Sequence, residues 1–223
     1  MRVPGLGGWS EDPLWSYVYP WLVGHDRVGG LAWRAGLGSD LGLLHETAAE
    51  IGTLPAGSRV LDIPSGSGVA LRGLRPGQGI ALFAADISAT MLERTMATAR
   101  ELGVADQVTP VVADVGALPW ADDSFDLVIS LTGLHCFPDP RRAVEEMVRV
   151  LRPGGVLSGS SLFTDTGPRY VPVQVVGRAA GILGPMSTTA QCRDWLTAAG
   201  AVDVQLTLSG GVGYFRAVGA STD

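Results

Sequence analysis

The sequence contains neither lysine nor asparagine, so all 16 of its Lys/Arg residues are arginines. Without lysine the chain cannot form a Schiff base with a carbonyl substrate, and it cannot supply the lysine of a P-loop. Without asparagine it has no acceptor for N-glycosylation. These absences exclude three kinds of chemistry before any motif is considered.

The charge balance gives no sign of a polyanionic partner. Acidic side chains outnumber basic ones by 22 to 16, which leaves a formal net charge of −6 at pH 7. A chain without a general basic field is not expected to bind nucleic acid or an anionic membrane. No apolar run approaches the roughly 18 residues of a membrane span, and the first residues lack the apolar core of a signal peptide. We therefore expect a cytoplasmic protein.

Cysteine is scarce, with only Cys136 and Cys192 present. No Cys-x-x-Cys pair or cysteine–histidine cluster surrounds them, so the pattern does not suit a structural zinc. We expect no bound metal, and both thiols are predicted to be reduced and partly buried.

The pattern of apolar residues predicts a single α/β domain with a helical N-terminal extension. Residues 1–55 are rich in glycine and aromatic side chains and contain no clear strand, which favours a lid segment. Residues 56–223 alternate short apolar runs with amphipathic stretches, as in a mostly parallel sheet with helices on both faces. Seven strands are predicted, at 59–63, 80–85, 107–112, 125–130, 155–161, 202–208 and 212–218. The last two are joined too closely for a parallel crossover and should form an antiparallel edge hairpin.

Three helices are predicted between these strands, at 88–102, 140–151 and 189–199. Apolar side chains recur in each at spacings of three and four residues. Ser88 and Asp139 are suitable N-caps, and Pro140 suits a first helical position. Pro153-Gly154-Gly155 and Gly200 should end the second and third helices.

The stretch Arg59–Leu71, RVLDIPSGSGVAL, joins a strand to a glycine-rich turn and a further predicted helix. Glycines permit backbone conformations closed to other residues and let a ligand approach the chain closely. The N–H groups at the start of a following helix can bind a carboxylate or phosphate. In open α/β sheets such sites lie beyond the C-terminal ends of the strands, where the strand order reverses. The stretch therefore predicts a ligand site at that edge.

The residues around this turn argue against a dinucleotide. After Gly66 and Gly68 the third glycine of the dinucleotide fingerprint is missing. Asp62 would repel a pyrophosphate and attract an ammonium group. Asp86 ends the second strand and suits ribose hydroxyls, and Asp114 follows the third strand and suits an adenine amine. Each aspartate alone is also explained as a turn or cap residue, but together they suit an adenosine that carries an amino acid.

These blocks resemble a known family. VLDIPSGSG is similar to the first motif of class I S-adenosylmethionine-dependent methyltransferases, and ADIS to their ribose-binding second strand. The segment from VVADVGALPWADDSFDLVISL to LRPGGVL is similar to the ubiquinone/menaquinone C-methyltransferase-like branch, the type 11 methyltransferase domain. The resemblance covers about residues 58–218. It implies a Rossmann-like fold with S-adenosylmethionine as cofactor and S-adenosylhomocysteine as product.

The resemblance also implies roles for single residues. Ser65, Gly66 and Gly68 would approach the methionine moiety, and Asp62 would reach its ammonium group through water. The other implied contacts are Asp86 on the ribose hydroxyls, Ile87 and Met91 against the adenosine, Asp114 on the adenine amine, the Val115 amide on a ring nitrogen and the Leu131 carbonyl on the ammonium. Pro64 departs from the family, which usually has glycine there, and it removes a backbone donor.

Methyl transfer is a direct displacement, so the protein must align acceptor, methyl and sulfur and exclude water. A general base is needed only where the acceptor must lose a proton. His135, shortly after the fourth strand, is the candidate catalytic residue, because histidine titrates near neutrality. The alternative is a histidine that packs beside the cofactor without proton transfer. We expect His45 to be exposed, and Asp122, Asp123 and Asp126 to form a solvated turn.

The aromatic N-terminal segment is the predicted acceptor wall. Large apolar side chains with polar tips suit a lid, and this segment offers Trp15, Tyr17, Tyr19, Trp21 and His25. A plain helix pair packed on the sheet edge is the alternative. Residues 165–187, an apolar stretch between two Gly-Pro pairs, are a second candidate wall.

We interpret the chain as an S-adenosylmethionine-dependent methyltransferase that acts on a small, partly apolar acceptor by in-line displacement. The acceptor atom stays open between oxygen, carbon, nitrogen and sulfur, and a homodimer is one option for the oligomeric state. Two other classes are retained. A protein that binds the cofactor without turnover is favoured by Pro64, and a nicotinamide-dependent oxidoreductase is disfavoured by Asp62 and the missing third glycine.

Overall fold

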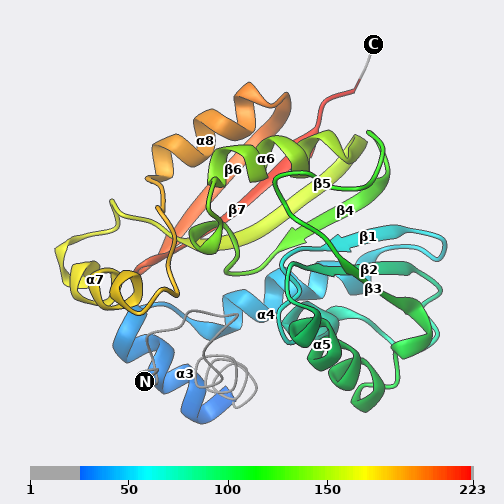
Figure 1. The fold of residues 1–223 in the computed structure, drawn as a ribbon, viewed down its shortest axis with the longest axis horizontal. Coiled ribbons are helices and arrows are strands. Elements are labelled where there is room, and N and C mark those ends of the chain that lie inside the picture. The colour runs from blue at the N-terminus through cyan, green and yellow to red at the C-terminus, as the bar shows by residue number, and fades with distance from the viewer. Residues whose placement is uncertain (1–25, 222–223) are drawn as a thin grey trace.

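The computed structural model describes residues 26–221, and its centre is one seven-stranded sheet of order β3-β2-β1-β4-β5-β7-β6 (Figure 1). Strands β1 to β5 run parallel, and β7 pairs antiparallel with both β5 and β6. The predicted fold class and edge hairpin are therefore confirmed. The strands are β1 Arg59–Asp62, β2 Ala81–Asp86, β3 Val108–Val112, β4 Phe125–Ser130, β5 Leu151–Leu162, β6 Ala201–Ser209 and β7 Val212–Gly219.

One predicted strand boundary was wrong by several residues, because β5 begins at Leu151 rather than at 155. Leu151 already pairs with Phe125, and the register then shifts so that Leu127 faces Val156. The prediction that Pro153-Gly154-Gly155 ends the second helix was also wrong, because α6 ends at Arg149 and these three residues lie within β5.

The three predicted helices are present as α5 Ala89–Glu101, α6 Pro140–Arg149 and α8 Thr189–Ala198. The side chains of Ser88 and Asp139 accept the amide hydrogens of Met91 and Arg142, so both predicted N-caps are confirmed. Further helices are α3 Asp26–Leu37, α4 Leu41–Ala49 and α7 Val171–Ala179, with short 3-10 turns η1 Glu50–Thr53, η2 Val69–Gly73, η3 Ala105–Gln107, η4 Leu134–Cys136 and η5 Pro168–Tyr170.

The helix expected directly after the glycine turn is absent from this position. Residues Val69–Gly73 form only the five-residue turn η2. Gly73 is the last residue of this turn, and a Cβ on it would collide with the Ala48 backbone of α4. Pro76 and Gly77 then prevent a longer helix from forming. A ligand in the glycine turn is therefore not held by a helix N-terminus, and α4 packs on η2 instead.

The sheet divides the core into two layers, and the strand residues alternate between them. Leu61 and Val128 belong to the cluster under α6 and α8. Val60 and Leu127 belong to the cluster that includes residues of α4, η2 and α5. In Figure 1, α6 and α8 lie on one side of the sheet and α4 and α5 on the other. Within the described range, no helix is long and apolar enough to cross a membrane.

Candidate functional site

The predicted ligand residues gather at the C-terminal ends of β1 to β4. Asp62 and Asp86 are the last residues of adjacent strands, and Asp114 follows β3 by two positions. Leu131 follows β4, which pairs with β1. The strand order reverses between β1 and β4, so this edge is the switch point at which ligands bind in open α/β sheets.

The glycine turn is fastened to β2 and to α5. Its amides donate to β2, from Ser65 to the Ala85 carbonyl at 2.8 Å and from Gly66 to Asp86 Oδ2 at 3.0 Å. Two hydroxyls of α5 hold the other side, with Thr95 Oγ1 2.9 Å from the Gly66 carbonyl and Thr98 Oγ1 2.9 Å from that of Ser67.

The two threonines were missed by the sequence analysis. Their spacing of three residues on α5 was available as a signal. The apolar face of the same helix, with Leu92 and Ala99, was the only pattern that was used. A polar pair facing a glycine loop is visible only when the helix is placed against that loop.

The two glycines of the turn serve different purposes. Gly66 has a φ of +53°, and a Cβ built on it would meet nothing within 4 Å. Gly68 has a φ of +84°, and a Cβ there would lie 3.0 Å from Leu71 Cδ1 and 3.4 Å from the Thr95 Cα atom. Gly68 is thus needed for packing, whereas Gly66 faces open space that a ligand can occupy.

Asp62 is a buried carboxyl with one oxygen that has no hydrogen-bond partner among residues 26–221. Asp62 is only 1% exposed, and its Oδ2 accepts no hydrogen bond within the described structure. Burial raises the pKa of this carboxyl well above its ordinary value, and the nearby charge of Asp86 raises it further. A buried carboxylate requires a cation or a donor. An ammonium group meets that requirement, so the residue fits the amino end of S-adenosylmethionine.

Asp86 both organises the site and remains an acceptor. Burial raises its pKa, while the amide hydrogen bonds from Ser88 and Gly66 act in the opposite direction. Its Oδ1 lies 2.9 Å from the Ser88 nitrogen, so the carboxylate joins the glycine turn to the start of α5. A carboxylate has about four acceptor sites, which leaves positions for ribose hydroxyls.

Apolar side chains beside Asp86 are exposed at the sheet edge. Ile87 is 72% exposed and Val112 is 62% exposed, whereas Met91 is buried. Asp114 is exposed, and its Oδ1 accepts the Gly116 amide hydrogen at 2.8 Å. The Val115 amide makes no hydrogen bond within the described structure. An adenine ring has an apolar face and a polar edge, and it matches this combination.

The end of β4 closes the site on the other side. The Leu131 carbonyl accepts the Thr132 hydroxyl at 2.7 Å, so one of its two lone pairs is already used. Pro64 follows a cis peptide bond and packs so closely on Gly133 that a Cβ at position 133 would collide with it. The unusual proline therefore lies against the β4 loop, away from the open side of Gly66.

His135 is buried and held through one ring nitrogen. Nδ1 lies 3.0 Å from the Leu162 backbone nitrogen and 3.3 Å from Ser161 Oγ. A backbone N–H can only donate, so Nδ1 must be unprotonated and the neutral ring carries its proton on Nε2. Burial lowers the pKa of this imidazole to about 4. Nε2 has no hydrogen-bond partner among residues 26–221.

The expected solvated turn of aspartates was wrong for Asp126. This residue lies in β4, and its side chain is only 12% exposed. It accepts the Arg59 amide hydrogen at 2.7 Å and forms an ion pair with Arg152. Asp122 does lie on the surface, where it pairs with Arg149 at 2.7 Å. The polar run that starts at Asp122 extends to Asp126, but β4 already begins at Phe125. Composition therefore assigned Asp126 to the turn although it belongs to the strand.

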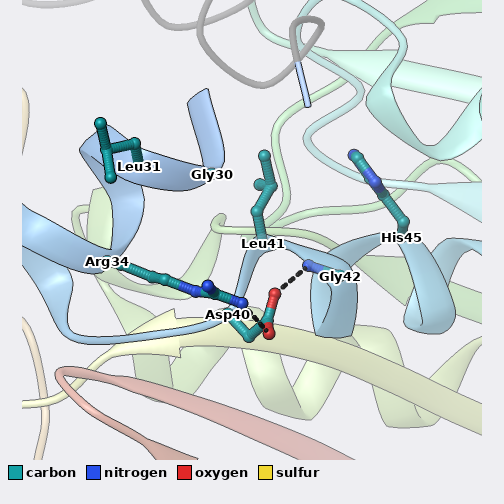
Figure 2. Close-up of a pocket in the computed structure, with 7 residues that line it drawn as sticks. All are labelled: Gly30, Leu31, Arg34, Asp40, Leu41, Gly42 and His45. Carbon is teal, nitrogen blue, oxygen red and sulfur yellow. Dashed lines mark hydrogen bonds and ion pairs between the residues drawn. The ribbon is translucent and has the colours of Figure 1, made fainter. Parts of the chain in front are cut away.

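A pocket of about 470 Å³ lies between α3 and α4 (Figure 2). We call it the α3–α4 pocket. In Figure 2 the side chains of Leu41 and His45 extend from α4 on the same side. Arg34 pairs with Asp40 at 2.8 Å. His45 is half-buried, so the expectation of an exposed histidine was wrong. The α3–α4 pocket is lined by Gly30, Leu31, Arg34, Asp40, Leu41, Gly42 and His45.

The predicted acceptor walls fall into two segments, of which only the second, 165–187, belongs to the described residues. Trp15, Tyr17, Tyr19, Trp21 and His25 lie outside the described residues. The second candidate wall, 165–187, contains α7, on which Val175 and Val176 are 60% and 62% exposed. Both free thiols are at least partly covered, because Cys192 is buried and Cys136 is half-buried.

Comparison with known proteins agrees with the geometry. Residues 61–158 match a family model described as a methyltransferase domain. An uncharacterized protein of Mycobacterium tuberculosis is 40% identical over 118 residues, which are 52% of this chain and 40% of that protein. The demethylmenaquinone methyltransferase of Clavibacter sepedonicus is 42% identical over 100 residues, or 45% of this chain and 39% of the relative. The chain thus spans about two fifths of the length of the curated relatives it matches.

A solved structure shares the fold at low sequence identity. The phosphoethanolamine N-methyltransferase 2 of Haemonchus contortus, solved with phosphomonomethylethanolamine and S-adenosylhomocysteine, superposes with a TM-score of 0.70 at 17% identity. The match covers 92% of this chain and 57% of that one. Residues 61–158 are thus similar to the methyltransferase domain family, and S-adenosylmethionine is the cofactor that the site fits.

Proposed function

We propose that this protein transfers the methyl group of S-adenosylmethionine to a small, partly apolar acceptor. The observation that carries the proposal is the buried Oδ2 of Asp62, which has no hydrogen-bond partner among the described residues and ends the strand that leads into the glycine turn. The cofactor supplies a sulfonium methyl, whose bond to sulfur breaks with both electrons staying on sulfur as the acceptor atom attacks. The protein's task is then to bind, align and exclude water.

Each part of the cofactor has a proposed contact on this edge. Asp62 and the Leu131 carbonyl hold the ammonium, and Ser65, Gly66 and Gly68 form the turn around the methionine moiety. Asp86 accepts the ribose hydroxyls. The adenine packs on Ile87 above Met91, with its amine on Asp114 and a ring nitrogen on the Val115 amide. The exposure of Ile87 supports this arrangement, because an adenine would cover it.

We infer that His135 is not a general base. To accept a proton at Nε2, the ring would need its proton on Nδ1, where the Leu162 N–H already points. A pKa near 4 also makes it a weak base at pH 7. In its neutral form His135 can instead donate from Nε2–H. If it faces the acceptor, it binds an oxygen atom there and orients the acceptor for attack.

The acceptor is proposed to contact the helices before β1. The α3–α4 pocket offers two leucines and the half-buried His45, which suits an apolar molecule with one polar group. Helix α4 also packs on η2, directly after the glycine turn, so it connects this pocket to the cofactor site. Residues Trp15, Tyr17, Tyr19, Trp21 and His25 precede α3 in the chain and are proposed to complete the wall.

The test is calorimetric binding of two ligands that differ in the amino acid. S-adenosylhomocysteine has the ammonium group, and 5′-methylthioadenosine lacks it. We expect Asp62→Asn to weaken the first ligand about 10- to 100-fold, the range for one charge-assisted contact, and to leave the second unchanged. Asp106→Asn, at an exposed aspartate, is the matched control and should change neither.

Two results would oppose the proposal. If the wild-type protein binds neither ligand, the cofactor site is wrong. If it binds S-adenosylhomocysteine but transfers no labelled methyl group to any of a panel of phenols, quinols, amines and thiols, a binding protein without turnover becomes the better interpretation.

A further inference from the structure

Side chains of α6 bind the backbone of the loop that is proposed to contact adenine. This loop, residues 114–120, connects β3 to β4, and it starts with the two proposed adenine contacts Asp114 and Val115. It has no regular secondary structure of its own between Asp114 and Trp120. Its own hydrogen bonds are confined to its first residues, so the backbone groups further along need partners from elsewhere.

Three side chains of α6 bind the backbone of this loop. We call Arg142, Glu146 and Arg149 the α6 clamp. The Glu146 side chain is only 5% exposed, and its Oε2 accepts the Leu118 amide hydrogen at 2.8 Å. The arginines bind carbonyls, with Arg142 Nε 3.1 Å from Gly116 O, Arg149 Nη2 3.2 Å from Leu118 O and Arg149 Nη1 2.9 Å from Trp120 O.

The clamp is also held together internally. Glu146 Oε1 lies 3.1 Å from Arg142 Nη2, and Glu146 Oε2 lies 2.8 Å from Arg149 Nη2. The hydrogen bond from Arg149 is the main cause that lowers the pKa of Glu146. A partly buried carboxylate between two guanidinium groups is a rigid, charge-assisted arrangement.

One residue, Gly116, connects the clamp to the proposed adenine carboxylate. Gly116 donates its N–H to Asp114 Oδ1 at 2.8 Å, and its carbonyl accepts Arg142 Nε. The far end of the loop has a separate anchor, because the Trp120 ring packs edge-on against Phe83 and Phe125 at centroid distances of 5.9 and 5.3 Å. The clamp itself binds the loop at Gly116, Leu118 and Trp120, and Gly116 is the point at which it reaches the proposed adenine contacts.

We propose that the α6 clamp positions Asp114 and Val115 for adenine and so sets the affinity for the adenosine half of the cofactor. These are positioning residues, because they would act on the adenine through the loop backbone that they bind. The inference rests on the proposed function, because it assumes that adenine binds at Asp114 and Val115. It predicts that Asp62 affects the affinity for the amino-acid part of the ligand, whereas the clamp affects the affinity for the nucleoside part.

Helix α6 provides matched controls one residue away. Glu145 pairs with Arg141 at 3.0 Å and with Arg142 at 3.7 Å. Within the described structure, neither Glu145 nor Arg141 forms a hydrogen bond or ion pair with the 114–120 loop. We would compare Glu146→Gln with Glu145→Gln, and Arg142→Met with Arg141→Met. Arg142 is half exposed, so its variant should fold even if Glu146→Gln does not.

Binding would be measured with S-adenosylhomocysteine and with 5′-methylthioadenosine. We expect Glu146→Gln and Arg142→Met to weaken both ligands by the same factor, roughly tenfold, as for one lost charge-assisted contact. The control variants should match the wild type. Hydrogen exchange of the amides at 115–118 in the free protein should become faster in the two clamp variants only, which reports on the loop itself.

The outcomes separate the two proposals. If the wild type binds neither ligand, the proposed function fails and the clamp's role fails with it. If the wild type binds both ligands and Arg142→Met has the affinity of Arg141→Met, the clamp is only a structural connection and the inference is overturned. A loss confined to S-adenosylhomocysteine would also overturn it, because the clamp would then act on the amino acid.

Discussion

At the scale of single residues, burial decides what the polar groups of the site can do. Asp62 and His135 are both buried, at 1% and 6% exposure, but their situations differ. Asp62 has an oxygen that no donor among residues 26–221 binds, whereas His135 has an acceptor nitrogen that the Leu162 amide already uses. The first is suited to receive a ligand cation, and the second is suited to remain neutral.

The buried neutral His135 should make the protein sensitive to acid. Its pKa is lowered to about 4 in the folded state, against an ordinary value of 6.5. The unfolded chain therefore binds more protons between these values, so stability falls as the pH falls through this window. From pH 7 to pH 4.5 we expect this residue to contribute a loss of roughly 2–3 kcal/mol in the free energy of unfolding.

Urea unfolding at several pH values would check the histidine prediction. His135→Gln should be less stable at pH 7 but should lose less stability on acidification than the wild type. The same loss on acidification in both proteins would mean that His135 is not held neutral in the folded state. His45→Gln is the control from a half-buried position.

At the scale of elements, the glycine turn separates packing from ligand binding. Alanine at position 68 would combine a left-handed backbone with contacts to Leu71 and Thr95, so we expect Gly68→Ala to cost roughly 2–4 kcal/mol. Alanine at position 66 meets no neighbour, so only the backbone term of roughly 1 kcal/mol remains.

Binding by the two glycine variants should follow the opposite order. We expect Gly66→Ala to lose S-adenosylhomocysteine binding, because its methyl group would enter the open space in which the ligand lies. Gly68→Ala should bind normally under conditions in which it is folded. Calorimetry combined with urea unfolding would measure both quantities, and equal affinities for Gly66→Ala and wild type would place the ligand elsewhere.

At the scale of the whole molecule, the two carboxyls at the site connect ligand binding to global stability. The pKa values of Asp62 and Asp86 are raised in the folded protein, chiefly by burial. A raised carboxyl pKa means that the free protein loses stability as the pH rises through that value. A ligand with an ammonium group pairs with the carboxylate and should reverse this loss.

Thermal unfolding across pH would test this linkage. At 100 times its dissociation constant, S-adenosylhomocysteine should stabilise the protein by about 2.7 kcal/mol and raise Tm by roughly 5–10 °C. At a fixed ligand concentration this Tm shift should grow from pH 5 to pH 8. The shift caused by 5′-methylthioadenosine should stay nearly constant, and a parallel increase for both ligands would argue against Asp62 as the ammonium partner.

Patterns in the sequence alone predicted the sheet, its edge hairpin, three helices with the N-caps of two of them, and the strand-end aspartates. These follow from local rules, because apolar periodicity and turn residues act over a few positions. The packing of distant segments determines that η2 is a short turn under α4 and that Asp126 is covered. The same packing places Thr95 and Thr98 against the glycine turn and lets side chains of α6 bind the 114–120 loop. It also decided that Nδ1 of His135 faces the Leu162 amide. Each of these depends on contacts between distant segments, which close only when the layers pack.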